Sequence, residues 1–212
     1  MTRPGDLAHS TPDADDQVSA LFERREQPVR ELADQAVAVA AACHDMAIRF
    51  HRGGKLVVFG IGGASTDAQH VAVEFVHPVI VGKRALPAIS LTTDIATVTG
   101  IAAGEGMAAI FSHQLRALAE PTDIALGISA EPDCPSVLAG LEAAHDLGLL
   151  TIALARADGA IATSKAVDHA LITSAVDPRV VKEVHVTAYH VLWELVHVFF
   201  EQPGVLDPGV VT

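Results

Sequence analysis

The sequence predicts an α/β protein, a three-layer αβα sandwich with a parallel five-stranded sheet and an N-terminal helical extension. Short, continuous apolar runs recur along the chain and alternate with segments of helical period. Uninterrupted apolar runs are typical of parallel strands buried on both faces, and helix-sized segments between them predict right-handed crossovers. We expect strands near residues 55–60, 87–91, 123–128, 149–154 and 169–173.

Segments of helical period lie before and between the expected strands. Helical periodicity begins near Val18, is interrupted at Pro28, and resumes over Val29–Phe50. The pair Gly53-Gly54 that follows is a typical helix stop. Further helices are expected near residues 65–76, 95–102, 107–119, 134–147 and 179–200.

Length and polarity predict one domain over residues 15–202. Residues 1–14 are polar and rich in Pro and Asp, so we expect them to be disordered, and residues 203–212 form a C-terminal tail. Half of the residues are hydrophobic and the mean hydropathy is +0.36, which favours a homo-oligomer, a dimer or tetramer that covers apolar surface. The alternative is a large core of Ala, Val and Leu within one subunit.

Charge and cysteine content exclude several classes of partner. The formal net charge is −12, with 26 acidic against 14 basic residues and no Lys/Arg cluster, so we expect neither nucleic acid nor an anionic membrane as a partner. No apolar stretch is long enough to cross a bilayer, and the first residues lack the apolar core of a signal peptide. Cys43 and Cys134 lie far apart in sequence, which favours a reduced, cytoplasmic protein.

The most informative segment is the glycine-rich turn that follows the first apolar run. Residues 60–63 (Gly-Ile-Gly-Gly) join that run directly to a helix, which brings helix N–H groups to the edge of the sheet where α/β folds bind ligands. A dinucleotide-binding fingerprint would need a third glycine where Ser65 stands, and no Gly-Lys-Ser/Thr of a nucleotide loop follows. The glycines could also serve only the tight turn.

Several histidines are candidates for chemistry. His70 and Glu74 lie about one helical turn apart and therefore share a face, although such pairs are common on solvated surfaces. The last helix, Val180–Gln202, is apolar nearly all round yet contains His185, His190 and His197. Buried polar side chains need partners. Each of these histidines alone is more often a hydrogen-bonded core residue than a ligand.

The segments GKLVVFGIGGASTDAQHVAVEF, PAISLTTD, DIALGIS and EVHVTAYHVLWELVH follow one another in the order and spacing of the sugar isomerase (SIS) domain family. Within it, the chain resembles the phosphoheptose (sedoheptulose-7-phosphate) isomerases over nearly its whole length. The resemblance implies a flavodoxin-like sheet, N-terminal helices that build a dimer or tetramer, and an active site shared between subunits.

The resemblance also implies site residues. His70, Glu74 and His190 match positions that bind zinc in the family, and Glu74 and His190 match its acid–base pair. Gly62, Gly63, Ser129 and Lys182 match positions that line the sugar or sugar-phosphate site. Lys182 stands where the family has a glutamine that ligates the metal, and an ammonium group has no lone pair for a metal. Water or His185 would then have to supply the fourth ligand.

The loop that binds phosphate in the family differs here. It has the sequence Ser129-Ala130-Glu131-Pro132-Asp133-Cys134, in which carboxylates replace hydroxyl groups. Two like charges a few ångströms apart repel by about 1 kcal/mol in water and about 4 kcal/mol near a protein surface. We therefore expect this loop to disfavour phosphate, unless Glu131 and Asp133 point to solvent and cap the helix that follows. Ile61, Ala64 and Ala103-Gly104 also depart from the family pattern.

Two functions remain open from the sequence. The first is a divergent phosphoheptose isomerase that moves a proton between adjacent sugar carbons through an enediol, with metal assistance. The second is a non-catalytic SIS paralogue that binds a ligand or assembles with another protein. The retained residues His70, Glu74 and His190 favour the first, and the altered loop favours the second.

Overall fold

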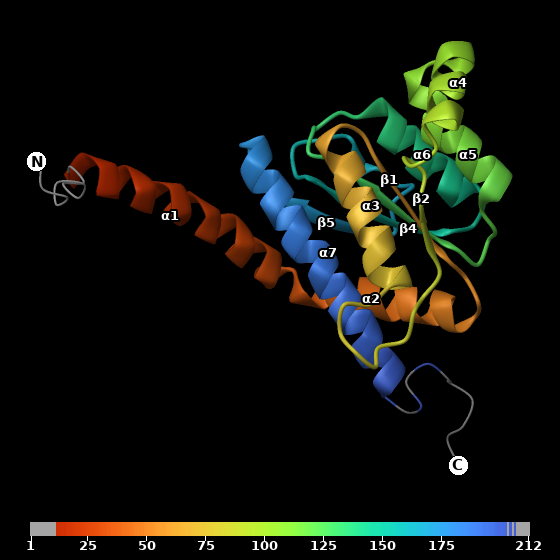
Figure 1. Cartoon of the computed structure of the whole chain (residues 1–212), viewed down its shortest axis with the longest axis horizontal. Coiled ribbons are helices and arrows are strands. Elements are labelled where there is room, and N and C mark those ends of the chain that lie inside the picture. The colour runs from red at the N-terminus through yellow and green to blue at the C-terminus, as the bar shows by residue number, and fades with distance from the viewer. Residues whose placement is uncertain (1–11, 203, 205, 207–212) are drawn as a thin grey trace, which may run out of the picture.

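The computed structural model describes residues 12–202, 204 and 206 (Figure 1). The predicted disordered segment and the predicted tail lie almost wholly outside these residues. Residues 12–14 of that segment form the first residues of helix α1 (Pro12–Asp34).

The sheet has five strands: β1 (Leu56–Gly60), β2 (Ala88–Ser90), β3 (Ile124–Ile128), β4 (Leu150–Arg156) and β5 (His169–Thr173). Their order is β2-β1-β3-β4-β5 and every pairing is parallel. This is the strand order of flavodoxin-like folds. Every residue of β1 and β3 is buried, which explains why these strands are continuous apolar runs without alternation. The predicted fold class is confirmed.

Helices cover both faces of the sheet (Figure 1). One core cluster joins one face to α2 (Ala36–His51), α3 (Gly63–Val76) and α7 (Pro178–Glu201). A second cluster joins the other face to α5 (Ile110–Leu118) and α6 (Pro135–Asp146), with α4 (Ile95–Glu105) beside them. Short 3-10 turns occupy Met107–Ala109 and Ile161–Thr163.

The predicted interruption at Pro28 is wrong, because α1 continues through this residue and ends only at Asp34. A proline removes one N–H from a helix but does not always end it, and Pro28 is buried here. The break falls at Gln35 instead, where the side-chain amide donates to the carbonyl of Ile172 at 2.7 Å and accepts from the Ile172 N–H at 3.1 Å. Gln35 thus pairs with the exposed edge of β5, and this contact fixes the turn between α1 and α2.

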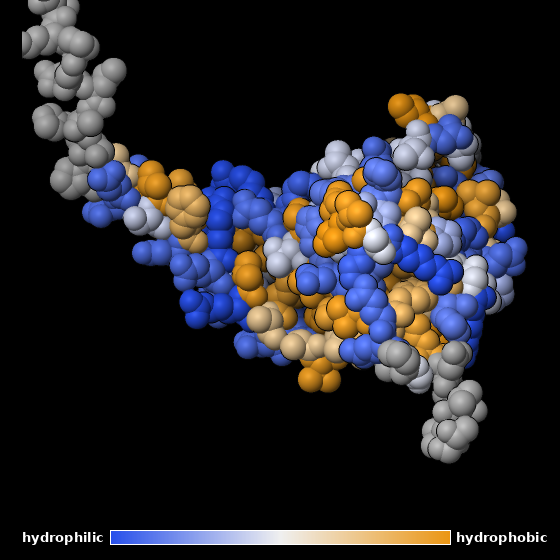
Figure 2. Space-filling model, turned by 60° about the horizontal axis from the view of Figure 1, so that its bottom comes forward, coloured by the Kyte–Doolittle hydropathy of each residue, from blue (hydrophilic) through white to orange (hydrophobic). Residues whose placement is uncertain are grey.

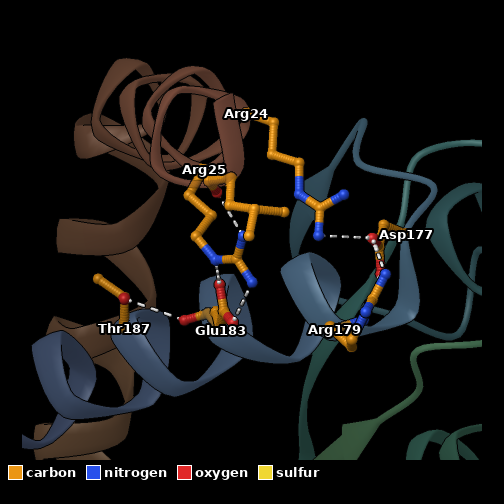
Figure 3. A network of polar contacts seen from close by, with 7 residues as sticks. Arg24, Arg25, Asp177, Arg179, Glu183 and Thr187 are labelled. Carbon is orange, nitrogen blue, oxygen red and sulfur yellow. Dashed lines mark hydrogen bonds and ion pairs between the residues drawn. The ribbon is translucent and has the colours of Figure 1, made fainter. Parts of the chain in front are cut away.

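Ion pairs tie α1 to the first turns of α7 (Figure 3). Nε of Arg25 lies 2.7 Å from Glu183 Oε2, and Arg24 lies 3.4 Å from Asp177. Asp177 also caps α7, because its carboxylate accepts from the backbone N–H and the guanidinium of Arg179. These hydrogen bonds lower the pKa of Asp177 to about 2. The network orients the first turns of α7, which carry part of the candidate site.

Candidate functional site

The Gly-rich turn brings the start of α3 to the carboxyl edge of the sheet. A Cβ at Gly60 would lie 2.8 Å from both the Ala64 side chain and the carbonyl oxygen of Ile128, so only glycine fits. Gly62 has φ of 62°, in the left-handed region that glycine adopts readily. The predicted strand-to-helix turn is therefore present, and Gly62 and Gly63 lie at the wall of a pocket.

Three side chains from α3 and α7 converge farther along the same two helices. Nε2 of His70 lies 3.2 Å from Oε1 of Glu74, and the ring of His190 lies 5.3 Å from that of His70, between centroids. One possible ligand atom from each residue lies within 4.8 Å of the other two. Glu74 is 9% exposed, whereas His70 is open to solvent. The acid–base pair and metal ligands expected from the sequence thus meet within a single chain.

Two aromatic residues of α7 hold this trio, and the sequence analysis missed both. The hydroxyl of Tyr189 lies 3.2 Å from Nδ1 of His70, and Nε1–H of Trp193 donates to the carbonyl of Glu74 at 2.8 Å. Burial, with the charges of Asp67 and Glu74, raises the pKa of Tyr189 well above its ordinary value, so its hydroxyl keeps its proton. Helical spacing could have identified Tyr189 and Trp193, because both lie near His190 on the side of α7 that contacts α3.

A pocket of about 400 Å³ opens at the carboxyl edge of the sheet, beside the trio rather than around it. Its wall combines the Gly-rich turn, the loop after β3 and the first turns of α7; the lining residues include Gly62, Gly63, Ser129, Glu131, Lys182 and His185. All four substrate-binding residues expected from the sequence lie on this wall. The trio stands one to two turns farther along α3 and α7, so the candidate site has two adjoining parts.

Lys182 lines the pocket and is held by Asp67, an aspartate of α3 that also lines the pocket and that the sequence analysis did not single out. Nζ of Lys182 lies 2.6 Å from both carboxylate oxygens of Asp67 and 3.0 Å from the carbonyl of Gly63. Asp67 precedes His70 by three residues on α3 and is 5% exposed. The ammonium group is therefore neutralised by a buried carboxylate, and an ammonium nitrogen has no lone pair with which to bind a metal.

The two carboxylates of the loop after β3, those of Glu131 and Asp133, lie in different surroundings. Oδ1 of Asp133 accepts from the N–H of Ala160 at 3.3 Å, and no side chain caps α6. Both residues are exposed, as that alternative required, but the capping role is wrong for both, because Asp133 accepts from the β4–β5 connection and Glu131 lines the pocket. Oγ of Ser129 donates to the Glu131 carbonyl at 2.8 Å, so its proton is used within the loop.

Comparisons with known proteins agree with this geometry. A family model described as the SIS domain matches residues 21–156. The phosphoheptose isomerase of Solidesulfovibrio magneticus is 41% identical over 180 residues, which cover 84% of this chain and 87% of that protein. This chain belongs to the SIS family, among the phosphoheptose isomerases. A further relative, the phosphoheptose isomerase of Aquifex aeolicus, is 36% identical over 167 residues, 79% of this chain and 83% of that protein.

Solved structures of the family share the fold. The phosphoheptose isomerase from Francisella tularensis has a TM-score of 0.79 at 30% identity and covers 86% of this chain and 97% of its own. The phosphoheptose isomerase from Neisseria gonorrhoeae has a TM-score of 0.77 at 28% identity, with the same coverage. The SIS family model includes His70 and Glu74 but ends before α7. Within the described part of this SIS protein, every helix is too short or too polar to span a membrane.

Proposed function

We propose that this SIS protein is an aldose–ketose isomerase that acts on a seven-carbon sugar phosphate. The observation that carries this proposal is the convergence of His70, Glu74 and His190 from two helices of one chain, beside a pocket large enough for a sugar. The relatives named phosphoheptose isomerase support the substrate class.

Isomerisation requires the transfer of a proton between adjacent carbons, with a matching exchange of protons between the two oxygens. Glu74 is suited to remove the proton from carbon, because its carboxylate is buried and its only side-chain hydrogen bond among the described residues is to His70. The C–H electron pair becomes the carbon–carbon double bond of the enediol, and the carbonyl oxygen takes up a proton. His190, on the open side of the trio, is suited to give and take that oxygen-bound proton. Glu74 then returns its proton to the neighbouring carbon.

The trio also fits a zinc ion. Imidazole nitrogens and a carboxylate oxygen are zinc ligands, and three protein ligands leave a position open for substrate, as in catalytic zinc sites. Nδ1 of His70 contacts the hydroxyl of Tyr189, which is the outer partner that a zinc-binding histidine needs. A zinc ion held by His70, Glu74 and His190 would polarise the sugar carbonyl.

The charged residues that line the pocket affect whether it can bind the phosphate group of a sugar phosphate. Glu131 and Asp67 are acidic, and Lys182 and Arg179 are basic, so the lining side chains balance in formal charge. The repulsion expected from the altered loop is therefore reduced, since Asp133 is engaged outside the pocket. Lys182 and Arg179 are paired with Asp67 and Asp177, so this balance lessens the repulsion of a phosphate group but supplies no unpaired cation for it.

The test is deuterium incorporation from heavy water into sedoheptulose 7-phosphate, followed by mass spectrometry. We expect incorporation by the wild-type protein and a loss of at least about a hundredfold in Glu74→Gln, the range that general acid–base groups contribute. The glutamine is isosteric, so the variant should keep its circular dichroism spectrum and unfolding midpoint. Absence of incorporation, with and without added zinc, would contradict the proposal and favour a non-catalytic ligand-binding or assembly module.

We also propose that the protein acts in the cytoplasm as a homo-oligomer. Figure 1 shows α1 projecting away from the body, and Figure 2 shows apolar side chains on this helix and on the body beside it. Phe22 is 69% exposed and Val18 is 51% exposed on the same stripe of α1. An apolar groove of about 300 Å³ runs between α1, α2 and α7. A second copy of the chain would cover this surface, as a dimer or tetramer.

A further inference from the structure

His185 is the residue of the pocket whose chemistry the proposed reaction leaves unused. It lies on α7 between Lys182 and Tyr189, is 2% exposed, and lines the pocket at the carboxyl edge of the sheet. Among the buried side-chain nitrogen and oxygen atoms of the described residues, only its Nε2 has no hydrogen-bond partner. Buried polar atoms are almost always paired, so an unpaired one in a pocket wall indicates a missing partner.

The other buried histidine of α7 shows that this is not a general feature of the helix. His197 is also 2% exposed, but each of its nitrogens lies at hydrogen-bond distance from a carbonyl oxygen, Nδ1 2.8 Å from that of Trp193 and Nε2 3.0 Å from that of Arg84, and the protonated nitrogen donates to one of them. His197 does not line the pocket. Of these two buried histidines, the one with the unpaired nitrogen is therefore the one that lines the pocket.

The environment of His185 determines what its Nε2 can bind. Burial lowers the pKa of His185 to about 4, and the charge of Lys182 acts in the same direction, so the ring is neutral at pH 7. The backbone of Ala155 hydrogen-bonds the ring and favours its proton. Since Nε2 has no partner, that proton lies on Nδ1, and Nε2 presents a lone pair. Such an atom accepts a hydrogen bond and cannot donate one.

Most of the remaining polar side chains of the pocket already have partners, and the exposed carboxylate of Glu131 is, like His185, a hydrogen-bond acceptor. Asp67 and Lys182 pair with each other, Arg179 pairs with Asp177, and Ser129 donates to the loop backbone. A ligand that fills the pocket must therefore bring its own donor to His185. Phosphate dianions and carbonyl oxygens carry no proton to donate, whereas each hydroxyl of a sugar does.

We propose that His185 is a specificity-determining residue that accepts a hydrogen bond from a hydroxyl group of a sugar bound in this pocket. The ligand class is a polyhydroxylated carbon chain whose hydroxyl-bearing part lies between the Gly-rich turn and α7. This inference rests on the proposed function in one respect: the sugars that test it are chosen from the proposed reaction.

The experiment uses the full chain labelled with ¹⁵N-histidine. The resonance of the unprotonated Nε2 is assigned by its disappearance in His185→Phe and is followed during titration with sedoheptulose 7-phosphate and, separately, with unphosphorylated sedoheptulose. We expect this resonance to move upfield as the nitrogen accepts a hydrogen bond. In calorimetric titrations, His185→Phe should bind about tenfold more weakly, the loss of one hydrogen bond. His197→Phe is the matched control and should bind with unchanged affinity.

Each outcome decides the question, and the shift of Nε2 during titration is measured on the wild-type protein, the variant serving in that experiment only to assign the resonance. Binding of sedoheptulose 7-phosphate without a shift of Nε2, and with equal affinity in His185→Phe, would overturn the role of His185 while the proposed function stands. Such a result would mean that a water molecule already satisfies Nε2. Binding of the unphosphorylated sugar alone, with the shift, would support His185 and contradict the proposed substrate. Absence of binding by either sugar would overturn both.

Discussion

Replacement of Lys182 by methionine tests its ion pair with Asp67 in the wall of the pocket. The perturbation removes the ammonium group but keeps an unbranched side chain of similar length. Asp67 would then hold a carboxylate that is 7% exposed in its side chain and has lost a cation 2.6 Å away.

The expected loss in the free energy of unfolding follows from how exposed the side chains of Lys182 and Asp67 are. Breaking a buried ion pair costs about 3–5 kcal/mol, and exposed pairs contribute less than about 1 kcal/mol. The side chain of Lys182 is 41% exposed, so we expect an intermediate loss. The free energy of unfolding should fall by about 2 kcal/mol, and Tm by about 4–8 °C for a chain of this length.

The assay is urea unfolding at fixed protein concentration, because the stability of an oligomer depends on concentration. A double-mutant cycle with Asp67→Asn isolates the pair, and we expect a coupling energy of at least about 1 kcal/mol. Arg30→Met is the control, since Arg30 and Glu26 form an exposed pair at 3.4 Å that should contribute less than about 0.5 kcal/mol. A Lys182–Asp67 coupling no larger than about 0.5 kcal/mol, the upper limit expected for the exposed control pair, would refute this account of the site.

The remaining predictions concern the trio, the acid stability and the assembly. Tyr189→Phe should lower zinc affinity by about 10–100-fold in a calorimetric titration, because Tyr189 positions His70, and unchanged affinity would argue against this role. The pKa of His185 is about 4 when folded and 6.5 ordinarily, so the unfolded chain takes up this proton first as the pH falls. The free energy of unfolding should therefore decrease between pH 6.5 and 4, by about 3 kcal/mol for this group, and His185→Phe should show a correspondingly shallower decline. Phe22→Asp should reduce the molar mass measured by light scattering, because it places a charge on the exposed apolar stripe of α1; the same mass as wild type would place the contact between subunits elsewhere.

The sequence by itself determined the layers and most of the element positions. Parallel strands buried on both faces must be apolar without interruption, so the run Leu56–Phe59 identified β1 before any tertiary information. The glycines at 60 and 62 marked the turn, because a side chain at Gly60 would collide with Ala64 and Ile128 and Gly62 adopts a positive φ that other residues rarely take. The spacing of His70 and Glu74 placed them on one face of α3, since helical geometry alone sets that relation. These features are local, and local rules predict them.

Only the tertiary structure decided which partner each polar group has. Pro28 did not end α1, because the turn is fixed at Gln35 by a contact with β5, which lies more than a hundred residues away in sequence. Lys182 pairs with Asp67, and Asp133 turns toward Ala160, although neither partner is near in sequence. His185 and His197 look alike in the pattern of α7, yet the fold places a carbonyl oxygen beside each nitrogen of His197 and leaves Nε2 of His185 without a partner. Such contacts depend on the packing of whole helices against the sheet, which sequence periodicity does not specify.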